Sequence, residues 1–209
     1  MQYLIEHFGE VAGRFGEHLR MTLLALTLAL LIAMPIGILI TRFRRWEAPV
    51  MGILGILYTI PSLALLVLLI PFVGLGLDNA VIVLVLYAQV ILVRNIVVGI
   101  NGVSPMIVEA ARGMGMSRWQ RLMRIELPLA LPVILAGVRI ATVTIIGIGA
   151  VAALINAGGI GRLLFDGVST GNPQKVVAGS IAAAALAGLA NTLFRWLERR
   201  AQRTIYGDE

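Results

Sequence analysis

Several residue types are absent or scarce in this chain, and each gap excludes a class of site. The sequence has no cysteine, so it holds no disulfide framework, thiolate nucleophile or cysteine metal site. Its only lysine, Lys175, lies in NPQKVV, which does not fit the phosphate-binding loop G-x-x-x-x-G-K-[ST]. We therefore predict no catalytic residue, no metal site and no cofactor in this chain, and ATP hydrolysis on another polypeptide if ATP is used.

Charged residues are also scarce, which indicates that the chain lies in a lipid bilayer. Of 209 residues, 59% are hydrophobic and only 13% are charged, a balance that a water-soluble domain of this length could not bury. The composition predicts an integral membrane protein that is all-helical. Its net charge of +6 comes from arginines spread between apolar runs, which indicates membrane topology rather than nucleic-acid binding.

Five apolar runs are long enough to cross a bilayer of about 30 Å as helices. The predicted spans are Met21 to Thr41, Val50 to Val73, Ala80 to Ile100, Leu127 to about Ile155, and Val176 to Trp196. The fourth run is too long for one straight crossing. It is either a tilted helix with an extension or a span followed by a separate re-entrant segment within residues 147–165.

Basic residues between the spans predict the orientation, because arginine and lysine accumulate on the cytoplasmic side. One side of a five-span model receives Arg42, Arg44, Arg45, Arg112, Arg118, Arg121, Arg124, Arg195, Arg199, Arg200 and Arg203, and the other receives Arg14, Arg20, Arg162 and Lys175. We therefore expect the amino terminus outside and the carboxy terminus in the cytoplasm. The chain forms a single domain, with residues 1–20 as a helix at the membrane surface and residues 197–209 as a cytoplasmic tail.

Residues 104–126 form a polar, arginine-rich passage that this orientation places in the cytoplasm. Ser104-Pro105 is a typical helix start, and Gly113 or Gly115 can end that helix, since glycine accepts a left-handed conformation. Ser117 to Gln120 fits a capping box, which predicts a second short helix that begins near Arg118 and runs along the membrane surface until Pro128 turns the chain into the fourth span.

The passage from Glu109 to Pro128 contains E-A-A, three residues, G, nine residues and I-x-L-P. These positions are filled by Glu109, Ala110, Ala111, Gly115, Ile125, Leu127 and Pro128. The pattern resembles the EAA-loop signature of permease subunits of binding-protein-dependent ABC importers, with no departure. The resemblance implies the five-helix core of a type I importer permease in the inner membrane. It also implies that Glu109, Ala110, Ala111, Arg112, Gly113 and Gly115 belong to the coupling helix that docks on a separate ATPase.

A narrower resemblance covers most of the chain. The segments TIPSLALL, VRNIVVGI, LPLALPVILAGVRIA and NAGGIGRLL are similar to permeases of osmoprotectant importers for glycine betaine, carnitine or choline. The resemblance implies as partners two ATPase subunits, an extracytoplasmic solute-binding protein, and a second permease that is identical or paralogous. It implies no nucleic acid. A methionine-type amino-acid importer is the nearest alternative, and an ATP-independent channel or secondary carrier is the alternative of another class.

Candidates for the solute path are the polar and aromatic residues inside the predicted spans. Arg94 either lines the path or extends its charge to the membrane surface, and Arg139 either lines the path or bonds helix-end carbonyls. Tyr58 and Tyr87 either recognise a quaternary ammonium group through their ring faces or serve packing. All the acidic residues lie outside the predicted spans, which favours solute selection mainly by the binding protein.

Overall fold

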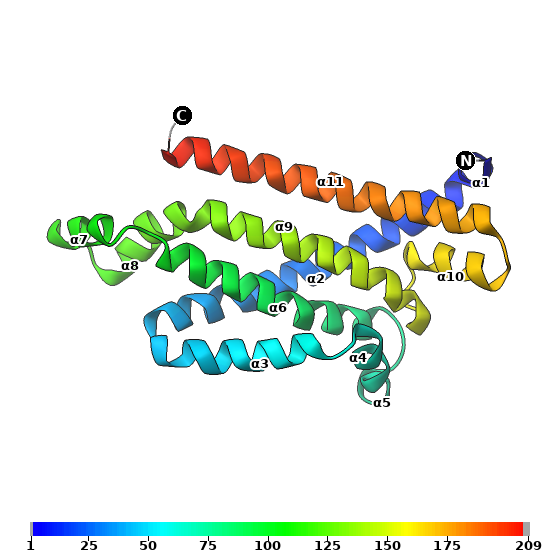
Figure 1. Cartoon of the computed structure of the whole chain (residues 1–209), viewed down its shortest axis with the longest axis horizontal. Coiled ribbons are helices and arrows are strands. Elements are labelled where there is room, and N and C mark those ends of the chain that lie inside the picture. Colours follow the sequence, from blue (N-terminus) through cyan, green and yellow to red (C-terminus); the bar gives the residue numbers. More distant parts are fainter. Residues whose placement is uncertain (1, 207–209) are drawn as a thin grey trace.

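A computed structural model describes residues 2–206, and every regular element of that range is helical. The α-helices are α1 Gln2–Glu6, α2 Phe8–Arg42, α3 Glu47–Thr59, α4 Ser62–Leu68, α5 Ile70–Val73, α6 Leu77–Asn101, α7 Pro105–Gly113, α8 Arg118–Arg121, α9 Leu127–Val151, α10 Gly161–Ser169 and α11 Pro173–Tyr206. Two 3₁₀ helices, η1 Arg44–Trp46 and η3 Ala152–Ile155, and the π-helix η2 Leu122–Glu126 complete the chain. Figure 1 shows the long helices lying along one common axis.

The helices account for the predicted spans, with one of them broken. Within the described residues, four helices are long and apolar enough to cross a membrane: Phe8–Arg42, Leu77–Asn101, Arg118–Ile155 and Pro173–Ile205. The pair Arg44–Thr59 and Ser62–Val73 is long and apolar enough only when its two helices are taken together, and it is bent by 91°. The prediction of a single run from Val50 to Val73 missed this bend.

Proline causes the break in the second span. Pro61 has no backbone N–H and forces the preceding residue out of helical geometry, and Ile60 has an extended ψ of 128°. The carbonyl of Ile60 is thereby released from the helix, and the hydroxyl of Tyr87 on α6 donates a hydrogen bond to it. The bend therefore keeps its freed backbone acceptor paired inside the protein, as the membrane interior requires.

Helix α6 occupies the centre of the bundle and packs against α2 on one side and α9 on the other. Glycines bring the helices close together: a Cβ at Gly37 of α2 would lie 2.5 Å from the side chain of Ile96, and a Cβ at Gly137 of α9 would lie 2.4 Å from Asn95. Close approach through small residues is the usual way in which membrane helices associate.

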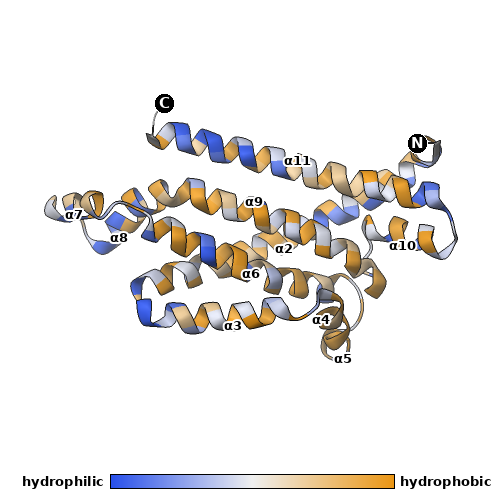
Figure 2. Cartoon of the chain, in the orientation of Figure 1, coloured by the Kyte–Doolittle hydropathy of each residue, from blue (hydrophilic) through white to orange (hydrophobic). Residues whose placement is uncertain are grey.

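The two ends of the bundle differ in composition and in what they carry. Helices α7 and α8 and the end of α11 lie together at one end, and the start of α2 and α10 lie at the other (Figure 1). The hydropathy colouring shows blue, polar stretches at α8, at the start of α3 and along the last turns of α11, with orange between the ends (Figure 2). The arginine-rich loops of the prediction thus gather at the α7 end.

The structure corrects two segments outside the predicted spans. Residues 1–20 do not form a separate surface helix, because α2 runs without a break from Phe8 to Arg42 after the single turn of α1. Likewise α11 continues to Tyr206, so the predicted tail is mostly the last part of the fifth helix, and its residues 207–209 lie outside the described range. In both cases, polar residues extend an existing helix beyond the apolar run.

The long fourth run resolves into a helix, a turn and a second helix. Helix α9 and η3 continue to Ile155, residues 156–160 turn, and α10 follows. The turn uses left-handed backbone at Asn156, Gly158 and Gly159. The extension was therefore the correct alternative up to Ile155, and α10 was not predicted.

Two side chains of α2 hold this turn in place. The carboxylate of Glu17 accepts a hydrogen bond from the N–H of Gly159 at 2.8 Å. The fully buried ring of His18 accepts one at Nδ1 from the N–H of Ile160 at 3.3 Å, so its Nε2 carries the proton that faces the carbonyl of Ile146 at 3.1 Å. One imidazole thus joins α2, α9 and the turn.

Candidate coupling site

Helix α7 projects from one end of the bundle (Figure 1). Most of its residues are exposed. Met106 is 77% exposed, and Met114, just after the helix, is 73% exposed. Ser104 stands at the N-cap and Pro105 at the first helical position, as predicted, although the Ser104 hydroxyl makes no capping hydrogen bond. Exposed methionines on a short projecting helix are typical of a surface that binds another protein.

The turn after α7 explains why its sequence needs a glycine at position 115. The N–H of Met116 bonds the carbonyl of Ala111 at 3.2 Å, and the N–H of Gly115 bonds that of Arg112 at 3.0 Å. These two bonds form a Schellman motif, in which Gly115 has the required left-handed φ of +79°. Gly113 is the last helical residue and does not have a positive φ, so Gly115 is the glycine that ends the helix.

Helix α8 begins with the capping box that the sequence predicts. The Ser117 hydroxyl accepts from the N–H of Gln120 at 3.3 Å, and the Gln120 side chain accepts from the N–H of Ser117 at 2.8 Å. Arg121 then donates from Nη1 to the carbonyl of Met116 at 2.9 Å, which fixes the turn against α8.

The expected turn at Pro128 is wrong. Helix α8 passes through η2 directly into α9, and Pro128 lies in the first turn of α9, where its missing N–H does not interrupt the helix. The predicted second short helix is therefore the first part of the fourth span. As a result, α7 is joined by one tight turn to a helix that crosses the whole bundle.

A buried ion pair ties this region to α2. Glu126, whose side chain is 6% exposed, accepts from Nη2 of Arg42 at 2.7 Å. Glu126 lies between Ile125 and Leu127, at the variable position of I-x-L-P, and Arg42 is the last residue of α2. Sequence reasoning treated both residues only as charges of the cytoplasmic loops. An acid within an otherwise apolar stretch beside a span was the available signal.

The two alanines of the signature have different environments. Ala111 is only 1% exposed and lies beneath the turn, whereas Ala110 is exposed together with Glu109 and Arg112. Of the two alanines, only Ala110 is therefore part of the outer surface of α7. Within residues 2–206, neither Glu109 nor Arg112 forms an ion pair, so both charges remain available on the outer side of α7.

Arg139 has its partners on α11. Its Nε lies 3.3 Å from a carboxylate oxygen of Glu198, and its Nη1 lies 3.2 Å from the side-chain oxygen of Asn191. Neither contact is to a helix-end carbonyl, the alternative that the sequence analysis considered. The pairing gives Arg139 a clear structural contribution, because it links the fourth and fifth spans.

The other path candidates lie elsewhere. Tyr58 on α3 and Tyr87 on α6 contact each other, with ring centroids 5.6 Å apart and planes tilted by 56°. Tyr58 is 43% exposed and Tyr87 is 6% exposed. Arg94 on α6 is exposed. Because α3 and α11 lie on opposite sides of the bundle (Figure 1), the structure brings the tyrosines together but separates them from Arg139.

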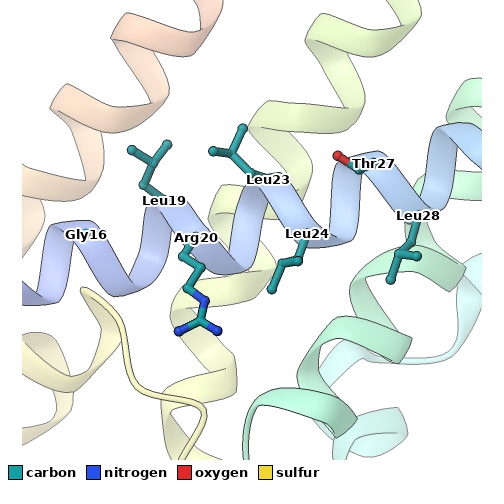
Figure 3. A pocket seen from close by; sticks show the side chains of 7 residues that line it. All are labelled: Gly16, Leu19, Arg20, Leu23, Leu24, Thr27 and Leu28. Carbon is teal, nitrogen blue, oxygen red and sulfur yellow. The ribbon is translucent and has the colours of Figure 1, made fainter.

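A shallow groove of about 460 Å³ follows one face of α2. Figure 3 shows its seven lining residues, all from that helix; four are leucines, and Arg20 is the one charged residue among the seven. A face made by one helix does not enclose a solute. The groove also contains none of the four path candidates, so it is a surface for lipid or for a neighbouring helix.

Buried amides are a further feature that the sequence analysis did not identify. Asn79, 1% exposed, donates to the carbonyls of Leu66 and Gly74 at 3.2 and 2.8 Å. Gln89, 3% exposed, donates to the carbonyl of Ala29 at 3.2 Å. These side chains satisfy backbone groups between helices, as an apolar environment demands. A single amide inside an apolar run was the signal for each of them.

Comparisons with known proteins cover nearly the whole chain. Residues 25–203 match the family described as binding-protein-dependent transport system inner membrane component. The chain is 34% identical over 200 residues to the glycine betaine/carnitine/choline transport system permease protein OpuCB of Bacillus subtilis, covering 96% of this chain and 92% of that protein. It is 39% identical over 207 residues to the osmoprotectant import permease protein OsmW of Salmonella typhimurium, covering 97% and 94%.

Solved structures give the same fold. A chain from the inward-facing MetNI methionine ABC transporter superposes with a TM-score of 0.84 at 25% identity, covering 91% of this chain and 95% of that one.

Proposed function

The chain belongs to the family of binding-protein-dependent transport system inner membrane components, and from this premise we propose that it carries an osmoprotectant such as glycine betaine, choline or carnitine. It is a multi-pass inner-membrane protein and a transmembrane subunit of an ABC importer. The proposed solute class is supported by the names of relatives that align along 96% and 97% of the chain.

The proposed coupling role depends above all on the geometry of α7. The helix projects from the bundle, is closed by the Gly115 turn, and presents Glu109, Ala110 and Arg112 without intramolecular ion pairs in the described range. A helix of this kind can be held by a complementary groove of a second protein. We assign that groove to a separate ATPase subunit, which binds and hydrolyses the ATP.

Transport then proceeds by alternating access. Two ATPase subunits close on ATP and draw two α7 helices together, and the paired permeases open toward a loaded solute-binding protein. Hydrolysis resets the cavity toward the cytoplasm. A second permease subunit, identical or paralogous, is needed because five crossings in one chain do not enclose a complete path.

Solute selection is assigned mainly to the binding protein, with the membrane path making a smaller contribution. Of the path candidates, Tyr58 has the accessible ring face for a quaternary ammonium group, and the buried ring of Tyr87 packs against it. Arg94 is exposed and forms no ion pair within residues 2–206. Arg139 would line the path only if its link to α11 opened during transport.

Reconstitution tests the proposed function. Proteoliposomes that contain this chain, its ATPase and its binding protein should take up labelled glycine betaine, choline or carnitine when ATP is supplied, and methionine should not accumulate. Omission of the ATPase should abolish uptake. If methionine alone accumulates, the proposed osmoprotectant solute is wrong and the chain belongs to an amino-acid importer. If this chain takes up solute without the ATPase, it is a secondary carrier or a channel.

The orientation has its own test. We propose that the α7 end faces the cytoplasm and that the end with α10 faces outward. Because the chain has no cysteine, single cysteines at Met114 and Ser169 can be labelled with an impermeant maleimide in intact cells. Met114 is preferred to Ser117, whose hydroxyl caps α8. We expect the label to react at position 169 only. Reaction at position 114 only would show that the orientation is the opposite of the one proposed.

A further inference from the structure

A groove of about 630 Å³ lies between the last turn of α2 and the start of the α8–α9 helix. Three arginines line it, Arg42 from α2 and Arg118 and Arg121 from α8, together with the aromatic rings of Phe43 and Trp119. The groove is at the same end of the bundle as α7 but on the seam between two membrane crossings. We call it the arginine groove.

Positive charge in the arginine groove is not fully balanced. Arg42 is paired with Glu126, and within residues 2–206 no other carboxylate forms an ion pair with these arginines. Arg121 bonds the carbonyl of Met116 through Nη1, and its Nε has no acceptor within the described part of the chain. Arg118 forms no ion pair with any residue in the range 2–206. Three guanidinium groups and one carboxylate leave the groove with an excess of two positive charges, which favours an anion.

An apolar groove adjoins the arginine groove and shares Phe43 with it. This second groove, of about 480 Å³, runs between α2 and the start of α3. Its lining consists of one charged residue, Arg45, and the apolar or aromatic residues Ile36, Leu39, Ile40, Phe43, Trp46 and Val50. Phe43 is 50% exposed and Trp119 is 65% exposed. Exposed aromatic rings at the ends of membrane helices are typical of the interface between headgroups and acyl chains. The arginine groove and the apolar groove therefore meet at the ring of Phe43.

We propose that the arginine groove binds the phosphate headgroup of an anionic phospholipid, with an acyl chain passing over Phe43 into the apolar groove. The guanidinium groups match phosphate oxygens in charge and hydrogen-bond geometry. Free phosphate would leave the apolar groove unused. A docked ATPase surface would have to cover hydrophobic walls that belong to two membrane crossings. A single phospholipid would fill both grooves, the arginine groove with its headgroup and the apolar groove with an acyl chain.

Native mass spectrometry of the purified full-length chain tests the site. The protein is prepared with equal amounts of phosphatidylglycerol and phosphatidylcholine, and the retained lipids are counted. Wild-type protein should retain phosphatidylglycerol in preference. The double variant R118Q/R121Q should reduce that retention by roughly fivefold for each guanidinium removed. The matched control R195Q/R199Q removes two arginines of α11 at the same end but outside the groove, and should stay within about twofold of wild type.

Further variants distinguish the two halves of the site. Arg118 has an exposed side chain and no ion pair among the described residues, so R118Q alone should lower phosphatidylglycerol retention without altering the melting temperature, even if the double variant unfolds. F43S should weaken retention of the lipid but not of its water-soluble headgroup analogue, glycerol phosphate.

Three results would overturn the proposal. Equal losses in the groove variants and the α11 control would mean a diffuse basic surface with no defined site. Full displacement of the lipid by millimolar inorganic phosphate would mean that the arginine groove binds anions in general and that the apolar groove does not hold an acyl chain. Loss of ATPase copurification in R118Q, with phosphatidylglycerol retention unchanged, would assign the arginine groove to the ATPase.

Discussion

Glu126 and Arg42, 84 positions apart in the sequence, form a 2.7 Å ion pair that joins the start of the fourth span to the end of the first. The carboxylate is almost fully buried, while the guanidinium side chain remains about one-third exposed. Neither residue belongs to the fixed positions of the EAA-loop signature. The pair nonetheless connects α2 to the helix that follows α7.

Replacing Glu126 with glutamine should destabilise the protein and weaken coupling. The change leaves Arg42 without its counter-ion, which we expect to cost roughly 2 kcal/mol, less than for a fully buried pair because Arg42 reaches solvent. Thermal unfolding in detergent measures the loss. In the reconstituted importer, E126Q should hydrolyse more ATP for each solute molecule transported.

The control for this pair is R14Q, which removes an exposed ion pair with Glu17 on α2. It should change stability by less than about 1 kcal/mol. The double variant R42Q/E126Q should regain part of the stability lost in E126Q. If the double variant is no more stable than E126Q and coupling is normal in both, the pair does not connect the two helices.

Gly115 should tolerate asparagine far better than valine. A β-branched residue at φ +79° costs about 1–2 kcal/mol, whereas asparagine adopts left-handed backbone at a lower cost. G115V should lose most ATPase copurification and uptake while it still inserts into the membrane, and G115N should keep both. Equal behaviour of the two variants would show that the Schellman turn does not set the position of α7.

The turn held by His18 should be sensitive to one added methyl group. In G159A the Cβ would meet a positive φ and lie 2.9 Å from Nδ1 of His18, while in G171A it would meet a positive φ alone. We expect a loss of about 1–2 kcal/mol for G171A and roughly twice that for G159A because of overpacking. Melting temperatures measured side by side test the order, and similar losses would argue against tight packing of His18.

Substitution of Tyr87 can distinguish the contribution of its hydroxyl from that of its ring. Y87F removes the hydrogen bond to the Ile60 carbonyl at the bend and should destabilise the protein by about 1 kcal/mol, with solute affinity unchanged because the ring remains. Y58F should have little effect on stability, since its side chain is 43% exposed. A large rise in the half-saturating solute concentration for Y87F would place the hydroxyl, rather than the ring, in the path.

Sequence patterns predicted the parts of the fold that depend on local composition. The four long crossings follow from uninterrupted apolar runs, and the Gly115 turn and the Ser117 capping box follow from residues within one or two turns. The family comparisons confirm the osmoprotectant-permease resemblance that the signature and the longer segments indicated. Local chemistry was sufficient for these features.

Features that depend on distant contacts were missed. The bend at Pro61 is stabilised by Tyr87 from another helix, and the burial of Glu126 requires Arg42. Whether a polar residue at a helix end starts a loop or prolongs the helix is likewise decided by what packs against it. This is why α2 and α11 are longer than their apolar runs. The placement of Arg139 against Glu198 also needed the relative positions of α9 and α11.

The passage from α8 to η3 is one continuous helical segment. Arg118–Ile155 comprises 38 residues, about 57 Å at 1.5 Å per residue. A tilt of about 5° around its midpoint displaces each end by about 2.5 Å in opposite directions, given that length. At the far end the carbonyl of Ile155 accepts a 2.7 Å hydrogen bond from the N–H of Gly76. Such a tilt would move the turn beside α7 and the start of α6, at the other end of the bundle, in opposite directions.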